Sequence, residues 1–124
     1  METLREIKFR AWNVRDKIMI SHNRLFRLDT SNELPFLPLL EKYNDDYQVM
    51  QFTGLKDRNG KEIYEGDIID TNGGRGEVIW NEELAAWGVK QMVSDHTWID
   101  RLCDWTDEEV IGNIYENPTL LSGK

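Results

Sequence analysis

The sequence has little of what secreted, metal-binding and membrane proteins use. Its 124 residues include one cysteine, Cys103, with two histidines and three prolines. A lone cysteine cannot form an internal disulfide, so a reducing cytoplasm is the expected setting. No apolar run approaches the roughly 20 residues of a membrane-spanning helix, and Met1 is followed by charged residues rather than an apolar signal segment. We expect a soluble, cytoplasmic protein that does not contact membranes.

Basic residues are scarce relative to acidic ones. Fifteen Lys and Arg oppose twenty-three Asp and Glu, which gives a formal net charge of −8. Such a charge repels phosphate backbones, whereas nucleic-acid binding usually needs clustered Lys and Arg. The first quarter of the chain is nevertheless rich in basic residues, namely Arg5, Lys8, Arg10, Arg15, Lys17, Arg24 and Arg27. Nucleic-acid binding through this segment, or an acidic surface that mimics DNA, is therefore kept as the alternative function.

Residues that could ligate a metal or perform catalysis do not occur at characteristic spacings. His22, His96 and Cys103 match no zinc-binding pattern, so we predict no metal site. Cys103 and His96 are the one conceivable nucleophile and base, but apart from Arg101 no neighbour in sequence would stabilise a thiolate. We predict no cofactor and no enzymatic activity, and an enzyme built around Cys103 is the weakest of three functional hypotheses.

Two further patterns have structural explanations. The glycines of Gly73–Gly76 could hold a phosphate through backbone amides, but the segment neither opens a helix nor precedes Lys-Ser/Thr. We predict a turn there. Glu62, Glu65 and Asp67 could pair as acid and base, but their position around a tight turn predicts surface and hydrogen-bonding roles.

What the sequence does contain is a run of closely spaced turns and strands from Gln51 to Ile69. Asn59-Gly60 is a strong hairpin signal, because glycine adopts positive φ freely and asparagine tolerates it. Asp57 precedes it and can accept hydrogen bonds from backbone N–H groups of the turn. Gly66-Asp67 gives a second reversal before a β-branched run. Three short strands in so few residues are typical of a barrel or sandwich.

Alternating and β-branched segments predict strands on both sides of this run. Ile7–Ala11 and Ile18–Ile20 predict a hairpin around a polar turn. Trp12 breaks the alternation and is expected either to cap an edge or to reach a neighbouring surface. The other predicted strands are Tyr47–Phe52, Gly76–Trp80 paired with Trp87–Gln91, and Val110–Tyr115. Ser31–Tyr43 is apolar but contains two prolines, which predicts a loop or one to two helical turns that plug the barrel.

Three segments resemble the motifs of one family, in the expected order. The central Thr53–Ile69 (TGLKDRNGKEIYEGDII), the opening Arg5–Trp12 and the closing Val110–Pro118 are similar to motifs of the YopX family, small proteins found largely in bacteriophages and prophages. The resemblance implies an SH3-like β-barrel in the C-terminal part, a bacterial host cell, and no established activity. It is weak from about Ser21 to Tyr47 and from about Met92 to Glu109, so no function is carried over there.

Together these observations predict a mainly β fold. We expect a small SH3-like β-barrel in the C-terminal part, with an N-terminal β-hairpin and one or two short helical segments. Residues 1–46 would form the hairpin and the plug, and residues 47–124 the barrel, as one compact unit. A chain of this length buries enough surface to fold without a disulfide or a metal.

The five tryptophans of the chain are the sequence feature that most strongly indicates a protein-interaction surface. Trp80 and Trp87 are expected either to fill the barrel core or to contact a partner. Trp98 and Trp105 flank a polar, acid-rich loop and are the candidate partner surface, because tryptophan is enriched at interaction hot spots. We predict a non-enzymatic protein-interaction module that binds a host or phage protein. Self-association as a homo-oligomer through barrel edges is a further expectation.

Overall fold

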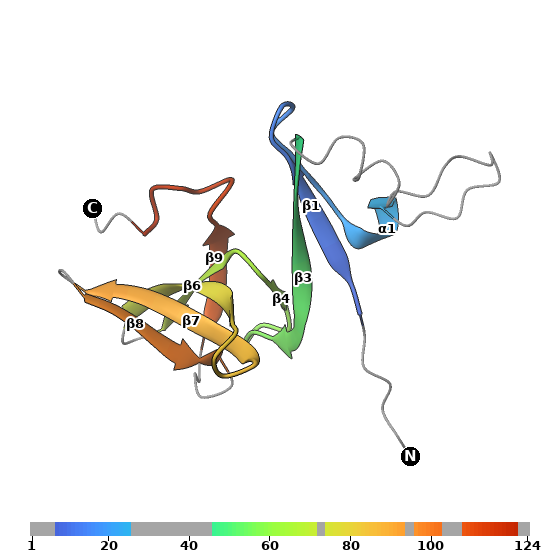
Figure 1. Cartoon of the computed structure of the whole chain (residues 1–124). Helices are drawn as coiled ribbons and strands as arrows, with labels where there is room; N and C mark the ends of the chain where they lie inside the picture. The colour runs from blue at the N-terminus through green and yellow to red at the C-terminus, as the bar shows by residue number, and fades with distance from the viewer. Residues whose placement is uncertain (1–6, 26–45, 72–73, 94–95, 103–107, 122–124) are drawn as a thin grey trace, which may run out of the picture. The chain divides into compact units, whose positions relative to one another are not determined.

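The structure is a computed structural model that describes residues 7–25, 46–71, 74–93, 96–102 and 108–121 (Figure 1). These residues form strands and one short helix, in the order β1 (Phe9–Asn13), β2 (Ile18–Ile20), α1 (His22–Leu25), β3 (Tyr47–Lys56), β4 (Glu62–Tyr64), β5 (Asp67–Thr71), β6 (Gly74–Asn81), β7 (Ala86–Val93), β8 (His96–Arg101) and β9 (Glu109–Asn113). The mainly β fold predicted from the sequence is confirmed.

The chain divides into two compact units within strand β3. We call Glu6–Gln51 the N-terminal unit and Phe52–Lys124 the C-terminal unit. Strand β3 therefore contributes its first half to one unit and its second half to the other. The predicted plug at Ser31–Tyr43 lies outside the described residues, so the predicted division at residue 46 stays a prediction.

In the N-terminal unit, β1 is the central strand and pairs antiparallel with both β2 and β3. Ala11, Trp12 and Met50 are buried. Trp12 does break the alternation, since it is buried next to the buried Ala11. It does not cap an edge, because β1 continues to Asn13 and pairs with a strand on each side. The alternative, that Trp12 reaches a neighbouring surface, stays a prediction. Adjacent residues of a strand face opposite sides, so the burial of both Ala11 and Trp12 means that β1 is covered on both faces.

The turn between β1 and β2 is held by the side chain of Asn13. Its Oδ1 accepts hydrogen bonds from the backbone N–H groups of Arg15 and Asp16, at 3.0 and 3.1 Å. Lys17 then adopts a left-handed conformation with φ 57° and donates its N–H to the Asn13 carbonyl oxygen. The polar turn predicted over these residues is confirmed, and it follows from the ability of asparagine to bond its own downstream backbone.

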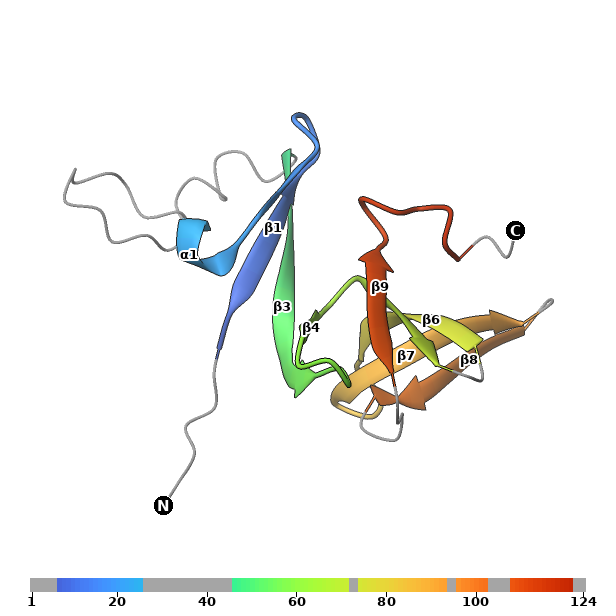
Figure 2. The same ribbon diagram turned by 180° about the vertical axis from the view of Figure 1, so that it is seen from behind.

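The C-terminal unit contains a five-stranded antiparallel sheet in the order β8-β7-β6-β5-β9, and β4 pairs with the second half of β3 (Figures 1 and 2). Strand β8 was not predicted from the sequence. The glycine-rich turn is also shorter than predicted, because Gly74 and Gly76 already lie in β6. A Cβ at Gly76 would run into the side chain of Val89 and the carbonyl oxygen of Lys90, so close strand packing explains this glycine.

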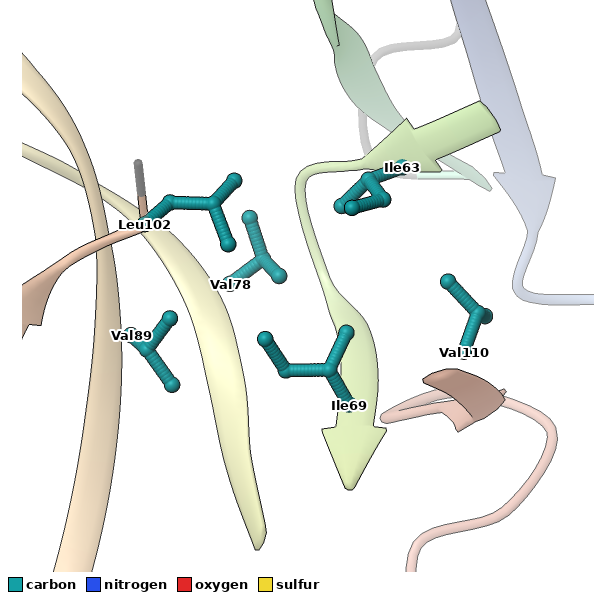
Figure 3. Packing of buried hydrophobic residues seen from close by; sticks show 6 residues of the cluster. All are labelled: Ile63, Ile69, Val78, Val89, Leu102 and Val110. Atoms are coloured by element: carbon teal, nitrogen blue, oxygen red, sulfur yellow. The ribbon is translucent and has the colours of Figure 1, made fainter. Parts of the chain in front are cut away.

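The sheet curls around one hydrophobic core (Figure 3). The core cluster consists of Ile63, Ile69, Val78, Val89, Leu102 and Val110, with Trp87 packed against it. Leu102 directly follows β8 and Val110 belongs to β9, although these strands form opposite edges of the sheet. Both edges can reach the same cluster only if the sheet is strongly curved. Figure 3 shows the six side chains pointing toward a common interior.

Candidate interaction surface

The central turn between β3 and β4 is organised by the buried carboxylate of Asp57. One oxygen, Oδ1, accepts the backbone N–H groups of Asn59 and Lys61, at 2.8 and 2.9 Å. Gly60 has a φ of 83° and donates its N–H to the Asp57 carbonyl oxygen at 2.9 Å. The hairpin predicted from Asn59-Gly60 and the accepting role of Asp57 both appear in the structure. They depend on a glycine at the left-handed position.

The same carboxylate also reaches a strand that is distant in sequence. The second oxygen of Asp57, Oδ2, accepts the N–H of Val110 in β9 at 2.9 Å. The backbone N–H of Arg58 donates to the carbonyl oxygen of Glu108, and its guanidinium lies 2.7 Å from the carboxylate of Glu109. The turn is therefore tied to the start of β9 at several points, which gives Asp57 a structural role.

The electrostatics of Asp57 follow from these contacts. Burial raises the pKa of its carboxyl, but the N–H groups of Val110, Lys61 and Asn59 outweigh burial. Together with the charge of Lys61 they hold the pKa below its ordinary value. The group is thus kept as an anion that accepts hydrogen bonds.

The second turn, at Gly66-Asp67, is also held by hydrogen bonds within the fold. Gly66 has a φ of 88°, donates its N–H to the carbonyl oxygen of Val78, and accepts the N–H of Ile114. Asp67 is buried, and its Oδ2 accepts the N–H of Tyr64 at 2.7 Å. The predicted hydrogen-bonding role of Asp67 is confirmed, but its predicted surface position was wrong, because the side chain is almost fully buried.

The outer face of the sheet carries one carboxyl with a shifted pKa. Glu77 lies directly opposite Lys90 in the β6–β7 register. Burial raises the pKa of the Glu77 carboxyl, Lys90 lowers it, and Glu65 raises it, so that the pKa lies above its ordinary value. The described residues contain no group of three or more His, Cys, Asp or Glu that could hold a metal.

A pair of tryptophans closes the β6–β7 hairpin. Trp80 and Trp87 are directly opposite each other, two residues beyond the fully buried pair Val78 and Val89, so all four lie on the core face of the sheet. The two indole rings are 5.1 Å apart between centroids and nearly perpendicular, at 74°. Trp87 packs against the core, whereas Trp80 is 44% exposed. Of the two alternatives left by the sequence, core filling describes Trp87, and Trp80 reaches solvent.

The loop that follows Trp80 is ordered by Asn81. Its Oδ1 accepts the backbone N–H groups of Glu83 and Leu84, at 3.0 and 3.2 Å. Ala85 is left-handed, with φ 48°. Glu82, Glu83 and Leu84 are exposed. The sequence predicted Asn81–Ala86 as the hairpin loop but gave it no functional role, although the two tryptophans that flank it were a signal for one.

The two tryptophans predicted as the partner surface are only partly placed. Trp98 lies in β8, with its Cα opposite that of Gln91. Its side chain lies outside the described residues, and so do Trp105 and Cys103. The partner-surface role of Trp98 and Trp105 therefore stays a prediction. The neighbouring Ile99 is described and is 43% exposed.

Comparison with known proteins identifies the family. The model of the YopX protein family matches residues 8–122, nearly the whole chain. The chain belongs to the YopX family. The resemblance seen in the three sequence motifs is thereby confirmed, and the Asp57 and Gly66-Asp67 turns lie in the central motif of this YopX chain.

Solved structures similar to this chain include one that matches over almost its entire length. It is the crystal structure of protein EF1440 from Enterococcus faecalis, with 25% sequence identity and a TM-score of 0.50. The similarity covers 94% of this YopX chain and 98% of that chain. No curated protein matches the chain. Among the described residues, no helix has the length and apolar character needed to cross a membrane.

Proposed function

We propose that the protein is a phage- or prophage-type, non-enzymatic protein-interaction module that acts in the cytoplasm of a bacterial host. The observation that carries the proposal is Trp80. It exposes 44% of its surface, and its ring packs at a nearly perpendicular angle against the ring of Trp87. A rigid, half-exposed indole offers large contact area at a small loss of conformational entropy when a partner binds.

We further propose that the C-terminal unit is an SH3-like β-barrel. A curled five-stranded antiparallel sheet with a single interior core supports this. SH3 domains bind extended, proline-rich segments of other proteins in grooves lined by aromatic side chains. The position of Trp80 at the end of the β6–β7 hairpin fits such a use.

The proposal is tested by capturing partners from a bacterial lysate with the full chain and with four variants. Trp80→Ala, Trp98→Ala and Trp105→Ala each remove one candidate contact, and Ile99→Ala is the control, since it removes an exposed apolar side chain of similar exposure. We expect a partner that is retained by Ile99→Ala and lost by Trp80→Ala. A partner that is lost only by Trp98→Ala or Trp105→Ala would show that the contact surface contains these residues rather than Trp80. A partner retained by all variants would contradict an aromatic contact surface.

The alternative function, binding of nucleic acid through the basic N-terminal segment, has less support. Arg15 is already held by Asp46 at 2.8 Å, and the chain as a whole is strongly acidic. Direct binding would show retardation of DNA or RNA at low salt that weakens steeply as salt rises. We expect no retardation. A steeply salt-dependent shift would favour the alternative.

A further inference from the structure

The proposed function does not say what kind of protein segment the partner presents. The residues of the β6–β7 hairpin indicate its chemical class. We infer that the hairpin tip, defined as Trp80 and the loop residues Glu82–Ala85, binds an extended protein segment that presents Lys or Arg side chains. This inference rests on the proposed function and names its partner class. Three properties of the tip support it: an exposed indole, carboxylates without an ion pair in the part of the chain that the structure describes, and a loop conformation held by hydrogen bonds.

The indole of Trp80 is suited to a cationic side chain. Trp87 meets it at a perpendicular angle, and 44% of Trp80 remains accessible to solvent. Tryptophan is the best of the aromatic residues at attracting a guanidinium or ammonium group to its ring face. Leu84, 43% exposed in the same loop, adds apolar surface for the aliphatic stem of such a side chain.

The carboxylates beside the indole are not neutralised. Glu82 and Glu83 are both exposed, and neither has an ion-pair partner among the described residues. Three described carboxylates differ in this respect, since Asp46 is paired with Arg15, Glu109 with Arg58, and Asp70 with Arg75. Two exposed negative charges, two and three positions along the chain from an exposed aromatic ring, complement a partner that carries positive charge and apolar surface together.

The tip is fixed before any partner arrives. The Asn81 side chain accepts the N–H groups of Glu83 and Leu84, and Ala85 donates its N–H to the Glu82 carbonyl oxygen at 3.3 Å. Trp80 is anchored through Trp87 to the core. A surface that is already ordered loses less conformational entropy when a partner binds, so its affinity is higher for the same contacts.

The charge of the tip also argues against other occupants. The segment Trp80–Trp87 contains no Lys or Arg, so it repels nucleic acid and acidic peptides. A second copy of the chain would bring a surface with the same net charge of −8. A basic segment of another protein is the occupant that the charge pattern favours.

The experiment titrates the full chain, labelled with ¹⁵N, with two synthetic peptides of equal length. One alternates Arg and Leu, and the other alternates Glu and Leu. The indole N–H signal of Trp80 is identified from the spectrum of Trp80→Phe. We expect this signal to shift on addition of the Arg peptide at low salt and to remain unchanged with the Glu peptide. Binding of both peptides, or of neither, would overturn the inference.

Variants test the contribution of the Trp80 indole and that of the two glutamate carboxylates separately. Trp80→Ala is expected to weaken binding of the Arg peptide at least about tenfold. Glu82→Gln and Glu83→Gln are each expected to weaken it about two- to fivefold and to reduce its salt dependence. The control Asp16→Asn removes one exposed charge from the N-terminal unit and is expected to leave the affinity unchanged. Since both glutamates are exposed, their variants remain informative even if Trp80→Ala fails to fold.

The remaining outcomes distinguish this inference from the proposed function. If the two glutamate variants bind the Arg peptide as tightly as the unchanged chain, the charge argument is wrong. If sedimentation shows a dimer that Trp80→Ala dissociates, the tip binds a second copy and the inference is overturned. A protein partner captured from lysate through Trp98 or Trp105, together with no response to the Arg peptide, would leave the proposed function standing without this inference.

Discussion

Single residues hold together parts of this chain that are far apart in sequence. Asp57 is the clearest case, since its carboxylate accepts backbone N–H groups from its own turn and from Val110, 53 positions away. A carboxylate that joins a turn to a distant strand contributes to stability in two ways. It satisfies donors that would otherwise be buried without partners, and it fixes the relative position of the two segments.

Asp57→Ala is expected to destabilise the C-terminal unit by about 3 kcal/mol, because the buried N–H of Val110 and two turn amides lose their acceptor. Denaturant unfolding measures the change. The control Asp16→Ala removes an exposed aspartate and is expected to change stability by less than about 0.5 kcal/mol. Equal effects of the two substitutions would contradict the role of Asp57.

The same carboxylate predicts a loss of stability in acid. Its pKa is lowered in the folded chain from an ordinary value of 3.8. A depressed folded-state pKa means that the contribution is fully present above the unfolded-state pKa and is lost as pH falls through the folded-state pKa. The unfolding free energy is therefore expected to fall from about pH 5 to about pH 2, and to fall less in Asp57→Asn. Parallel curves for the two proteins would contradict the prediction.

Glu77 is expected to affect the pH dependence of the unfolding free energy in the direction opposite to Asp57. Burial raises the pKa of its carboxyl above 4.5, against the effect of Lys90 and with that of Glu65. A raised folded-state pKa means that the contribution is present below the unfolded-state pKa and is lost as pH rises through the folded-state pKa. Relative to the unchanged chain, Glu77→Gln should gain stability as pH rises from about 4 to about 7, measured by unfolding at each pH. A constant difference would contradict this.

At the scale of elements, the β6–β7 hairpin shows how local and distant interactions combine. Its strands pair without a shift over the whole register from Glu77–Lys90 to Asn81–Ala86. Val78 and Val89 bury their side chains on the core face, and the two tryptophans extend that face to the end of the hairpin. The loop itself depends on the side chain of Asn81.

Asn81→Ala is expected to lower stability by about 1 kcal/mol, since two loop amides lose their acceptor. Native-state hydrogen exchange should show faster exchange of the Glu83 and Leu84 amides, with the core strands little affected. Asn81→Asp keeps an accepting oxygen and is expected to retain the slow exchange. Fast exchange of these amides in the unchanged chain would show that the hydrogen bonds are not formed.

Most elements around tight turns could be predicted from the sequence. Asn59-Gly60, Gly66-Asp67 and the Asn13 turn were placed correctly, because their conformations depend on a few neighbouring residues. Strand β8 was missed, because its two large apolar residues, Trp98 and Ile99, are adjacent and do not alternate with polar ones, and because the strand depends on its pairing with β7.

At the scale of the whole C-terminal unit, one core joins strands from both edges of the sheet. Ile63, fully buried in β4, contacts the same cluster as Val110 in β9. Ile63→Ala is expected to destabilise this unit by about 3 kcal/mol, through lost burial and the cavity that remains. Hydrogen exchange in β4–β9 should accelerate together, because a shared core unfolds cooperatively.

Ile99→Ala is the matched control for Ile63→Ala, since it removes the same atoms from a side chain that is 43% exposed. Its effect is expected to stay within about 0.5 kcal/mol. If Ile63→Ala accelerated hydrogen exchange in β4 alone, the result would show that β4 does not share a cooperative core with β5–β9.

The sequence by itself determined the turns, the mainly β character and the membership of the YopX family, because glycine, asparagine and aspartate act over a few residues and leave recognisable motifs. Only the tertiary structure decided that Asp57 reaches Val110, and that Trp87 is packed against the core while Trp80 is exposed. Trp80 and Trp87 have the same side chain on the same hairpin. Their difference depends on which of them the curvature of the sheet brings against the core cluster, and that depends on strands far away in sequence.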